Sequence, residues 1–182
     1  ELCGNSASAP AGLTDVVEIF PSICAFAALK SDGSVTTWGH SGQGGDSSSV
    51  SSDLSSGVSD IFSNSGASAA VKSDGSVITW GASNRGGDSS SVSNDLSSWV
   101  TQIFSTSYAF AALKSDGSVI TWGVSDFGGD SGSVSSDLSS GVVELYSNEQ
   151  AFAAVKSDCF TRGTRLRYRG KSILLVLNLI EY

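Results

Sequence analysis

Serine, aspartate and one histidine are the residue types in this chain that would be needed for hydrolytic chemistry. A serine nucleophile needs a general base, and His40 is the only histidine among 182 residues. Two similar segments carry Ala82 and Val124 at the position of His40, and no G-x-S-x-G motif is present. We therefore predict that the chain is not an enzyme and uses no cofactor.

Recurring aspartates in Ser/Gly-rich segments raise the question of calcium, because carboxylate oxygens are ligands that calcium prefers. Such a carboxylate more often accepts local backbone N–H groups, so we predict no metal site. Recurring tryptophans suit sugar stacking, but a Trp that is identical in every copy of a segment favours packing between copies. The aspartates are Asp46, Asp53, Asp88, Asp95, Asp130 and Asp137, and the tryptophans are Trp38, Trp80 and Trp122.

These residues belong to an internal repeat with a period of 42 residues. The repeat runs without an insertion or deletion, so each copy should occupy an equivalent place in a regular array. The period is followed by Lys30, Lys72, Lys114 and Lys156, by Asp32, Asp74, Asp116 and Asp158, and by Val16, Val58, Val100 and Val142.

Each unit is predicted to hold three β-strands. Residues 26–30 and 34–38 form two strands joined by a turn at Asp32-Gly33, because Asp-Gly supplies the positive φ values of a tight hairpin. β-branched and aromatic residues predict a further strand at 58–63. Its equivalents lie at 16–20, 100–105 and 142–147.

A Ser-rich crossing connects one unit to the next and is predicted to be a loop pinned by Val50 and Leu54. A three-stranded sheet of this size cannot bury its apolar residues alone, so the units must pack on one another. Propeller blades run about 40 to 50 residues, which suits this unit. We predict an all-β fold, namely a β-propeller-like array of about four 42-residue blades, partial or open, with a C-terminal β-hairpin or extended tail. A linear β-solenoid is the alternative architecture.

The predicted domains are a repeat array and a tail. The array covers 1–159, with units at 16–57, 58–99 and 100–141 and a partial unit at 142–159, and the tail covers 160–182.

The segment from Ala109 to Gly123, AFAALKSDGSVITWG, is followed by Gly-Gly-Asp and later by Ser-Gly-Val. This repeat resembles that of the regulator of chromosome condensation family, in the short-repeat version found in a propeller-type β-lactamase inhibitor protein. The resemblance covers Val16 to Asp158 and implies a propeller, commonly of seven blades, that binds proteins. It does not by itself imply the family's guanine-nucleotide exchange activity. Because the chain has fewer units, the expected partners are proteins, including further chains that complete the propeller or a larger complex.

Charge divides the chain in two. Up to Cys159 there are five basic and seventeen acidic residues, and after it there are five basic residues and one acidic residue. The net charge is −8 and the array lacks clustered Lys and Arg for phosphate contacts, so we predict no nucleic-acid partner. The apolar run at 173–180 is too short to span a bilayer. We predict no transmembrane segment and leave peripheral membrane association open.

We interpret the tail as a docking segment that caps the open array or inserts into a partner. The alternation of basic and apolar residues at 165–169 predicts a half-buried strand. A terminal cap and a stretch foreign to the native protein are the alternatives. The predicted docking residues are Arg165, Arg167, Tyr168, Arg169, Leu174, Leu175 and Leu177.

Two loops differ between units, one before the Ala-rich strand and one after Trp-Gly. Positions that hold the fold must agree between units, whereas positions that meet a partner need not. Aromatic residues and Arg are favoured at interface hot spots, and a His adds pH sensitivity. The predicted protein-binding residues are Tyr108, Phe127, Arg85, His40, Trp99, Asn64, Asp126 and Gln150.

The sequence thus predicts a non-catalytic protein-binding propeller module. The alternative is a structural or accessory subunit of a larger, membrane-associated or soluble assembly, docked through the tail, and a sugar- or calcium-binding module is a third interpretation. The absence of Met predicts a processed or truncated N-terminus and leaves the compartment open. A Cys3–Cys24 disulfide is also left open.

Overall fold

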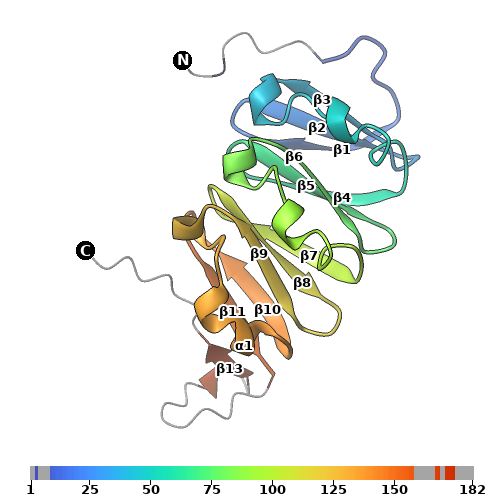
Figure 1. The fold of residues 1–182 in the computed structure, drawn as a ribbon. Helices are drawn as coiled ribbons and strands as arrows, with labels where there is room; N and C mark the ends of the chain where they lie inside the picture. Colours follow the sequence, from blue (N-terminus) through green and yellow to red (C-terminus); the bar gives the residue numbers. More distant parts are fainter. Residues whose placement is uncertain (1–2, 4–8, 158–166, 169–170, 175–182) are drawn as a thin grey trace.

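The chain folds as a curved array of four antiparallel β-sheets that lie side by side (Figure 1). The computed structural model describes Cys3 and residues 9–157, 167–168 and 171–174. The array does not close into a ring, so the fold is all-β and propeller-like but open, as the repeat predicts. We call the sheets blades 1 to 4 in chain order.

In blades 1 to 3 the second strand of the unit is the middle strand and pairs with both neighbours. The strands are β1 (Val16–Pro21), β2 (Ala25–Lys30) and β3 (Val35–Gly39) in blade 1, β4 (Val58–Ser63), β5 (Ala67–Lys72) and β6 (Val77–Gly81) in blade 2, and β7 (Val100–Ser105), β8 (Ala109–Lys114) and β9 (Val119–Gly123) in blade 3. Blade 4 contains β10 (Val142–Ser147), β11 (Phe152–Lys156), β12 (Arg167–Tyr168) and β13 (Lys171–Leu174). The strands predicted at 58–63, 100–105 and 142–147 are therefore confirmed.

The Ser-rich crossings between blades contain short helical turns in addition to the predicted loop. They are the 3₁₀ turns η1 (Ser41–Gln43), η2 (Ser48–Val50), η3 (Ser83–Arg85), η4 (Ser90–Val92), η5 (Ser125–Phe127) and η6 (Gly132–Val134), and the single α-helical turn α1 (Ser135–Leu138). Leu54 is buried under the first crossing, as predicted for a pin, and Leu96 and Leu138 repeat it.

The hairpin between the second and third strands differs from the two-residue turn that Asp-Gly predicts. In the turn of blade 1, residues 31–33, only Gly33 has a positive φ, of 76°, and its N–H donates to the Lys30 carbonyl. This is a three-residue loop, in which a type I turn ends at a left-handed glycine. Asp32 accepts hydrogen bonds from the N–H and the hydroxyl of Ser34, at 2.9 and 2.7 Å. The same bonds hold the turns of blades 2 and 3.

A β-bulge in the first strand of every blade decides which residues reach the core. In β4 the register shifts between Val58 and Asp60, and Val58 and Ile61 are both buried in one cluster with blade 1. In a regular strand, residues three apart would point to opposite faces of the sheet. The same shift recurs in the other blades and explains the repeated apolar spacing.

The core lies between blades rather than within one. Each blade has a front face, which meets the next blade, and a rear face, which meets the preceding blade. Alanines of the middle strand keep the front face flat, so that the next sheet approaches closely. Between blades 2 and 3 the front face supplies Ala67, Ala69, Val71, Val77 and Leu96, and the rear face supplies Val100, Ile103, Phe110, Ala112 and Trp122.

Side-chain hydrogen bonds join neighbouring blades at both ends of their strands. Trp80 Nε1 donates to the Gly44 carbonyl at 3.1 Å, and Trp122 Nε1 donates to the Gly86 carbonyl at 3.0 Å. At the other end a lysine ammonium donates to a carbonyl in the preceding crossing. These lysine bonds join Lys72 to Asp53, Lys114 to Asp95 and Lys156 to Asp137.

Blade 4 takes its third strand from the segment predicted as a tail. Strands β12 and β13 form the predicted C-terminal hairpin, and β13 pairs with β11. Ile173 lies opposite Val155, as Val119 lies opposite Leu113 in blade 3. The fourth sheet therefore draws on both sides of the boundary predicted at residue 159.

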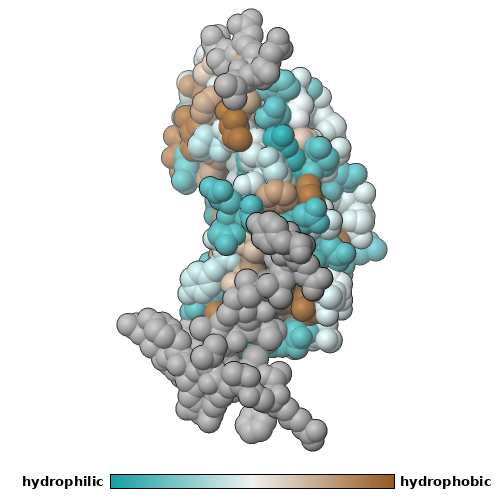
Figure 2. All heavy atoms as spheres, turned by 90° about the vertical axis from the view of Figure 1, so that its left-hand side faces the viewer, coloured by the Kyte–Doolittle hydropathy of each residue, from teal (hydrophilic) through white to brown (hydrophobic). Residues whose placement is uncertain are grey.

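At the N-terminal end of the array, a disulfide ties Cys3 to blade 1, and the apolar rear face of blade 1 is exposed. Cys3 and Cys24 are joined, with their Cα atoms 4.9 Å apart, which realises the bridge that the sequence left open. On the rear face of blade 1, Ile19 is 49% exposed, whereas the equivalent Ile61 is 1% exposed. The brown residues that gather at the top of Figure 2 lie over this blade.

Candidate functional site

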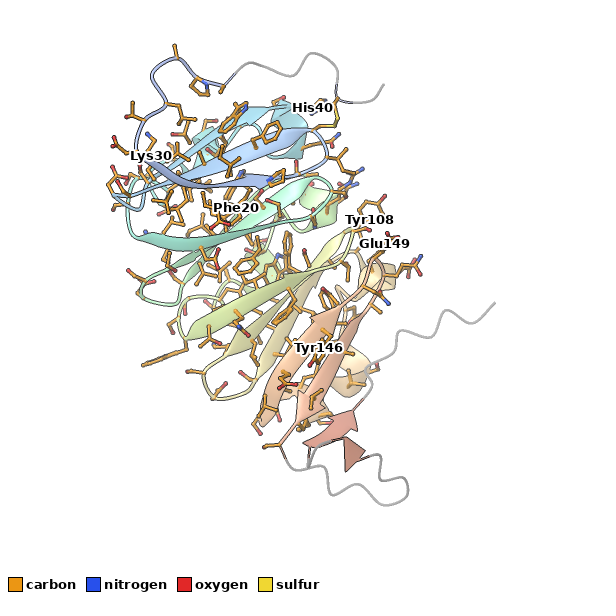
Figure 3. All side chains as sticks on the ribbon, turned by 180° about the vertical axis from the view of Figure 1, so that it is seen from behind. Phe20, Lys30, His40, Tyr108, Tyr146 and Glu149 are labelled. Carbon is orange, nitrogen blue, oxygen red and sulfur yellow. A yellow bond between two sulfur atoms is a disulfide. The ribbon has the colours of Figure 1, made fainter. Side chains whose placement is uncertain are left out.

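The variable loops meet at one end of the blades, which we call the loop edge. It consists of residues 22–24, 64–66, 106–108 and 148–150 together with 40–43, 82–85 and 124–127. The opposite end, which we call the hairpin edge, consists of the turns at 31–33, 73–75 and 115–117. In Figure 3, His40, Tyr108 and Glu149 lie along the loop edge, and Lys30 lies on the other side of the array.

One polar side chain per blade fixes the geometry of the loop edge. In blade 2, Asn64 Oδ1 accepts the N–H groups of Gly66 and Ala67, and Asn64 Nδ2 donates to the Arg85 carbonyl at 2.7 Å. Asn64 is only 7% exposed, so this predicted binding residue serves to join two loops of its own blade. The side chains that accept the equivalent strand N–H in the other blades are Ser22, Thr106 and Asn148.

Three of the predicted binding residues lie together in one group, which we call the aromatic cluster: Arg85, Tyr108 and Phe127. The Tyr108 and Phe127 rings meet edge to face, with centroids 4.5 Å apart and an interplanar angle of 71°. The guanidinium carbon of Arg85 lies 5.0 Å from the centroid of the Tyr108 ring. All three residues are half-buried. The cluster therefore bridges blades 2 and 3 and keeps part of its surface open.

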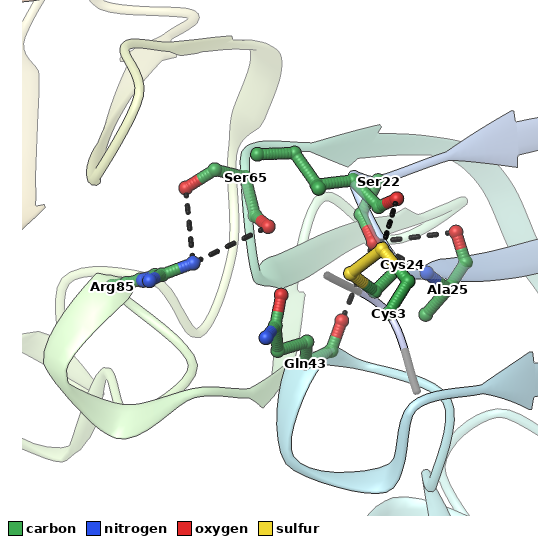
Figure 4. Close-up of a disulfide and its surroundings, with 8 residues drawn as sticks. Cys3, Ser22, Cys24, Ala25, Gln43, Ser65 and Arg85 are labelled. Atoms are coloured by element: carbon green, nitrogen blue, oxygen red, sulfur yellow. Dashed lines mark hydrogen bonds between the residues drawn. A yellow bond between two sulfur atoms is a disulfide. The ribbon is translucent and has the colours of Figure 1, made fainter. Parts of the chain in front are cut away.

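The Arg85 side chain is held in place by blade 2. Its Nη1 donates to the carbonyl and the hydroxyl of Ser65, both at 3.4 Å (Figure 4). A Cβ at Gly66 would lie 2.9 Å from the same Nη1, so a larger residue there would displace the guanidinium from this position. A cation over an aromatic ring contributes about 0.5 to 1 kcal/mol at an exposed site. A side chain ordered in this way loses less conformational entropy when a partner binds.

Other predicted residues lie exposed on the same edge without joining the cluster. His40, Asp126 and Gln150 are exposed in their loops. The His40 N–H donates to the Cys24 carbonyl at 2.8 Å, which ties its loop to the start of the middle strand in blade 1. The loop edge therefore combines an ordered aromatic centre with a polar surround.

Trp99 lies apart from these residues, at the hairpin edge. Trp99 is 69% exposed, and its φ of 67° is in the left-handed region. The equivalent positions in blades 2 and 4 hold Gly57 and Gly141, with φ of 75° and 76°, and the one in blade 1 holds Asp15, with a φ of 60°. A bulky residue in this region is a backbone outlier, and such outliers concentrate at functional positions.

The predicted docking residues of the tail are only partly described. Arg167 and Tyr168 belong to β12, and Leu174 ends β13. Arg165, Arg169, Leu175 and Leu177 lie outside the described residues.

Sequence reasoning missed a ladder that connects the tips of the loop edge. The Ser65 N–H donates to the Ser107 carbonyl at 3.3 Å, and the Ser107 N–H donates to the Glu149 carbonyl at 2.9 Å. These residues follow the 42-residue period, so their equivalence could be read from the sequence. Hydrogen bonds between backbone groups do not require particular residue types, so the bonds themselves could not be predicted. The ladder fixes the loops of blades 2, 3 and 4 relative to one another.

The part of the chain that the structure describes contains no group of three or more His, Cys, Asp or Glu side chains that would suit a metal ion. Three of the six recurring aspartates, Asp46, Asp88 and Asp130, instead accept a backbone N–H from two residues on in their own loops. Over the same residues, no helix has the length and apolar character needed to cross a membrane.

Neither a protein-family model nor a curated protein matches this chain. Among solved structures it is similar to human WBSCR16, at 19% identity and a TM-score of 0.50, over 76% of this chain and 44% of that chain. It is also similar to the CRINKLY WD40 ectodomain of the Arabidopsis thaliana receptor kinase ACR4, at 17% identity and a TM-score of 0.50, over 84% of this chain and 56% of that chain. The chain thus spans about half the length of these two proteins. At this identity the likeness establishes a propeller-like fold and no more.

Proposed function

We propose that the chain is a non-catalytic protein-binding module that contacts its partner through the loop edge. The observation that carries this proposal is the aromatic cluster, in which Arg85 from one blade lies over the ring of Tyr108 from the next, and Tyr108 meets Phe127 edge to face. The blade-repeat positions of these residues hold different residue types in each unit, so the fold does not require one particular residue type there. Trp, Tyr and Arg are the residue types most enriched at interface hot spots.

The described part of the tail favours the loop edge over the tail as the contact surface. Strand β13 is paired with β11 inside blade 4, so these residues already have a place in the fold. An accessory subunit docked through the tail would need this segment to face another chain. The repeat's resemblance to the regulator of chromosome condensation family, whose propellers bind proteins, agrees with the loop-edge proposal.

Site-specific photo-crosslinking tests the proposal. A photoreactive amino acid is placed at Asp126, on the loop edge, and in a matched variant at Ser115, which is also exposed but lies on the hairpin edge. We expect the variant at Asp126 to crosslink a protein that the variant at Ser115 does not. The crosslinked protein is then identified by mass spectrometry and produced for binding assays.

Binding of that protein is next measured for two variants of the aromatic cluster. Tyr108→Ala with Phe127→Ala should weaken binding at least about tenfold, and Arg85→Lys should weaken it because an ammonium lacks the planar face that stacks on Tyr108. Circular dichroism checks that both variants remain folded. Crosslinking only from Ser115, or affinity unchanged within about twofold in the double variant, would refute the proposal.

A further inference from the structure

The rear face of blade 1 is an apolar surface that no other blade of the array covers. Ile19 is 49% exposed and Phe26 is 38% exposed on this face. The equivalent residues of blade 3, Ile103 and Phe110, are 2% and 0% exposed, because blade 2 packs against them. Trp38 lies on the same face of blade 1 and is half-buried, whereas the equivalent indoles of blades 2 and 3 are 2% exposed. The rear face of blade 1 therefore lacks the cover that blades 2 and 3 receive from the blade before them.

This face nevertheless has the residues and the geometry of a face that is buried. Five residues form the rear face of blade 3, and blade 1 carries the same five residue types at the same repeat positions. They are Val16, Ile19, Phe26, Ala28 and Trp38, which correspond to Val100, Ile103, Phe110, Ala112 and Trp122. Phe26 and Trp38 are stacked, with ring centroids 5.4 Å apart and planes 18° from parallel. The buried pair in blade 3 has centroids 5.4 Å apart and planes at 23°, so the exposed pair is already in the arrangement of an interface.

The front face of blade 4, at the other end of the array, carries the matching half of such an interface (Figure 1). Blade 2 meets blade 3 through two alanines and a valine of its middle strand, and β11 has the same three residue types at the equivalent positions. They are Ala67, Ala69 and Val71 in blade 2, and Ala151, Ala153 and Val155 in blade 4. Both alanines of blade 2 are 0% exposed, whereas both alanines of blade 4 are half-buried. Tyr146 stands where Phe104 packs against blade 4, and it is 58% exposed. The array thus exposes both halves of a blade interface, one at each end.

We propose that a second copy of the chain covers the rear face of blade 1 with the front face of its own blade 4. The same contact joins the two remaining faces, so two arrays of four blades close a ring of eight. Propellers have about four to eight blades, so a ring of this size is within their range. The chain also spans about half the length of the two propeller-like proteins to which it is similar.

The interfaces inside the chain favour this head-to-tail contact over a contact between two rear faces. Within the array, bulky Ile, Phe and Trp side chains of a rear face always meet the alanines of a front face. Two rear faces would set rings against rings and would leave both alanine faces uncovered, so they would pack less closely. The occupant of the exposed face is therefore a face that the chain itself carries.

Sedimentation velocity of the unaltered chain tests whether it pairs. Between about 1 and 200 µM we expect the particle to change from one chain to two chains, with no larger species. A denaturing gel without reductant checks that Cys159, the cysteine outside the Cys3–Cys24 disulfide, has not joined the two chains covalently. A single chain at every concentration, or assemblies of more than two chains, would refute the closed ring.

Two charge variants test which faces meet. Ile19→Asp places a carboxylate on the rear face of blade 1, and Ala153→Asp places one on the front face of blade 4. Each should weaken pairing at least about tenfold, because the contact would bury an unpaired charge. The matched controls are Val17→Asp and Val143→Asp, in the same two blades at a repeat position that is exposed in all four units, and they should leave pairing unchanged. Circular dichroism checks the fold of each variant, and an equal loss in the controls would overturn the assignment of the faces.

A mixture of the two charge variants distinguishes a head-to-tail contact from a contact between like faces. Each variant keeps the face that the other has lost, so the mixture should form mixed pairs through one intact contact at concentrations where neither variant pairs alone. Native mass spectrometry identifies such pairs by mass. A contact between two rear faces would instead leave Ala153→Asp pairing with itself, which would contradict the proposal.

Amide hydrogen exchange of the unaltered chain locates the contact without any variant. At dilutions where the chain is single, β2 has an uncovered rear face and should exchange faster than β8. At concentrations where pairs form, exchange should slow in β2 and β11 and stay the same in β8. Pairing that leaves β2 and β11 unchanged would refute the proposal. The loop edge belongs to neither face, so the crosslinking test at Asp126 stands whatever the outcome here.

Discussion

At the scale of single residues, the left-handed backbone conformation of Trp99 lowers the stability of the fold. Of the three equivalent positions, Asp15 also has a positive φ, of 60°, and the other two are glycines, which adopt a positive φ without a steric penalty. We predict that Trp99→Gly raises the free energy of unfolding by about 1 kcal/mol, because it removes the left-handed strain of a residue with an exposed side chain. Urea unfolding measures the change, and Gly141→Trp is the matched reverse variant. A loss of stability in Trp99→Gly would mean that contacts of the indole outweigh the strain.

The aspartates of the hairpin turns make a second prediction at this scale. The serine hydroxyl and then the serine N–H lower the pKa of Asp32, Asp74 and Asp116. A carboxyl with a lowered pKa in the folded state stabilises the fold above its ordinary pKa of 3.8, and this contribution is lost as the pH falls through the lowered value. We therefore predict that stability declines below about pH 4.

Replacing the three serines isolates this effect. In the triple variant Ser34→Ala, Ser76→Ala and Ser118→Ala the hydroxyl bonds are absent, so stability should change less steeply between about pH 5 and pH 2. Urea midpoints across this range measure it. An unchanged slope would show that the backbone N–H bonds alone account for the lowered pKa values.

At the scale of elements, the same tryptophan should matter very differently in different blades. Trp122 is buried between two blades, whereas Trp38, on the rear face of blade 1, is only half-buried. We predict that Trp122→Ala costs about 3 to 5 kcal/mol of unfolding free energy, and that Trp38→Ala costs less than about 2 kcal/mol. Chemical denaturation of both variants tests the difference. Equal losses would show that Trp38 is covered as completely as Trp122.

The repeat made most elements predictable and hid a few others. An exact period placed β4, β7 and β10 where β-branched residues gather. The turn class escaped, because Asp-Gly suits both two-residue and three-residue hairpins and only the backbone distinguishes them. The sequence predicted a C-terminal hairpin but not its pairing with blade 4, because β13 lies beyond the point where the period is lost at Cys159.

The candidate site was predictable in part for a different physical reason. Variation between units pointed to Tyr108 and Phe127, which the structure brings together. The same variation also pointed to Asn64, which is buried and holds its own loop. Thr106 occupies the same position in the next blade and makes equivalent hydrogen bonds to its own loops. Variation in residue type at this position therefore did not indicate a binding surface. The sequence analysis grouped Trp99 with the residues of the loop edge, whereas the structure places it at the hairpin edge.

At the scale of the whole molecule, a linear array should not unfold evenly. Blades 2 and 3 pack against a neighbour on each side, whereas blade 1 has an exposed rear face. Stability in such arrays is roughly a sum over units and the interfaces between them. We predict slower amide hydrogen exchange in β5 and β8 than in β2, measured by mass spectrometry of peptic peptides. Equal protection in all three strands would indicate one cooperative unit.

The hydrogen bonds of Trp80 and Trp122 give the array a direction, because each runs from one blade to the blade before it. Each Nε1 donates to the carbonyl of a glycine 36 residues earlier in the chain. One stretch of 42 residues therefore contains both the tryptophan that bonds to the preceding blade and the glycine whose carbonyl accepts from the following blade. A tandem duplication of that stretch in the gene would therefore create a new blade together with a working junction on either side. Elongation by copying requires no compensating mutation elsewhere, whereas a substitution at the glycine or the tryptophan breaks a junction at once.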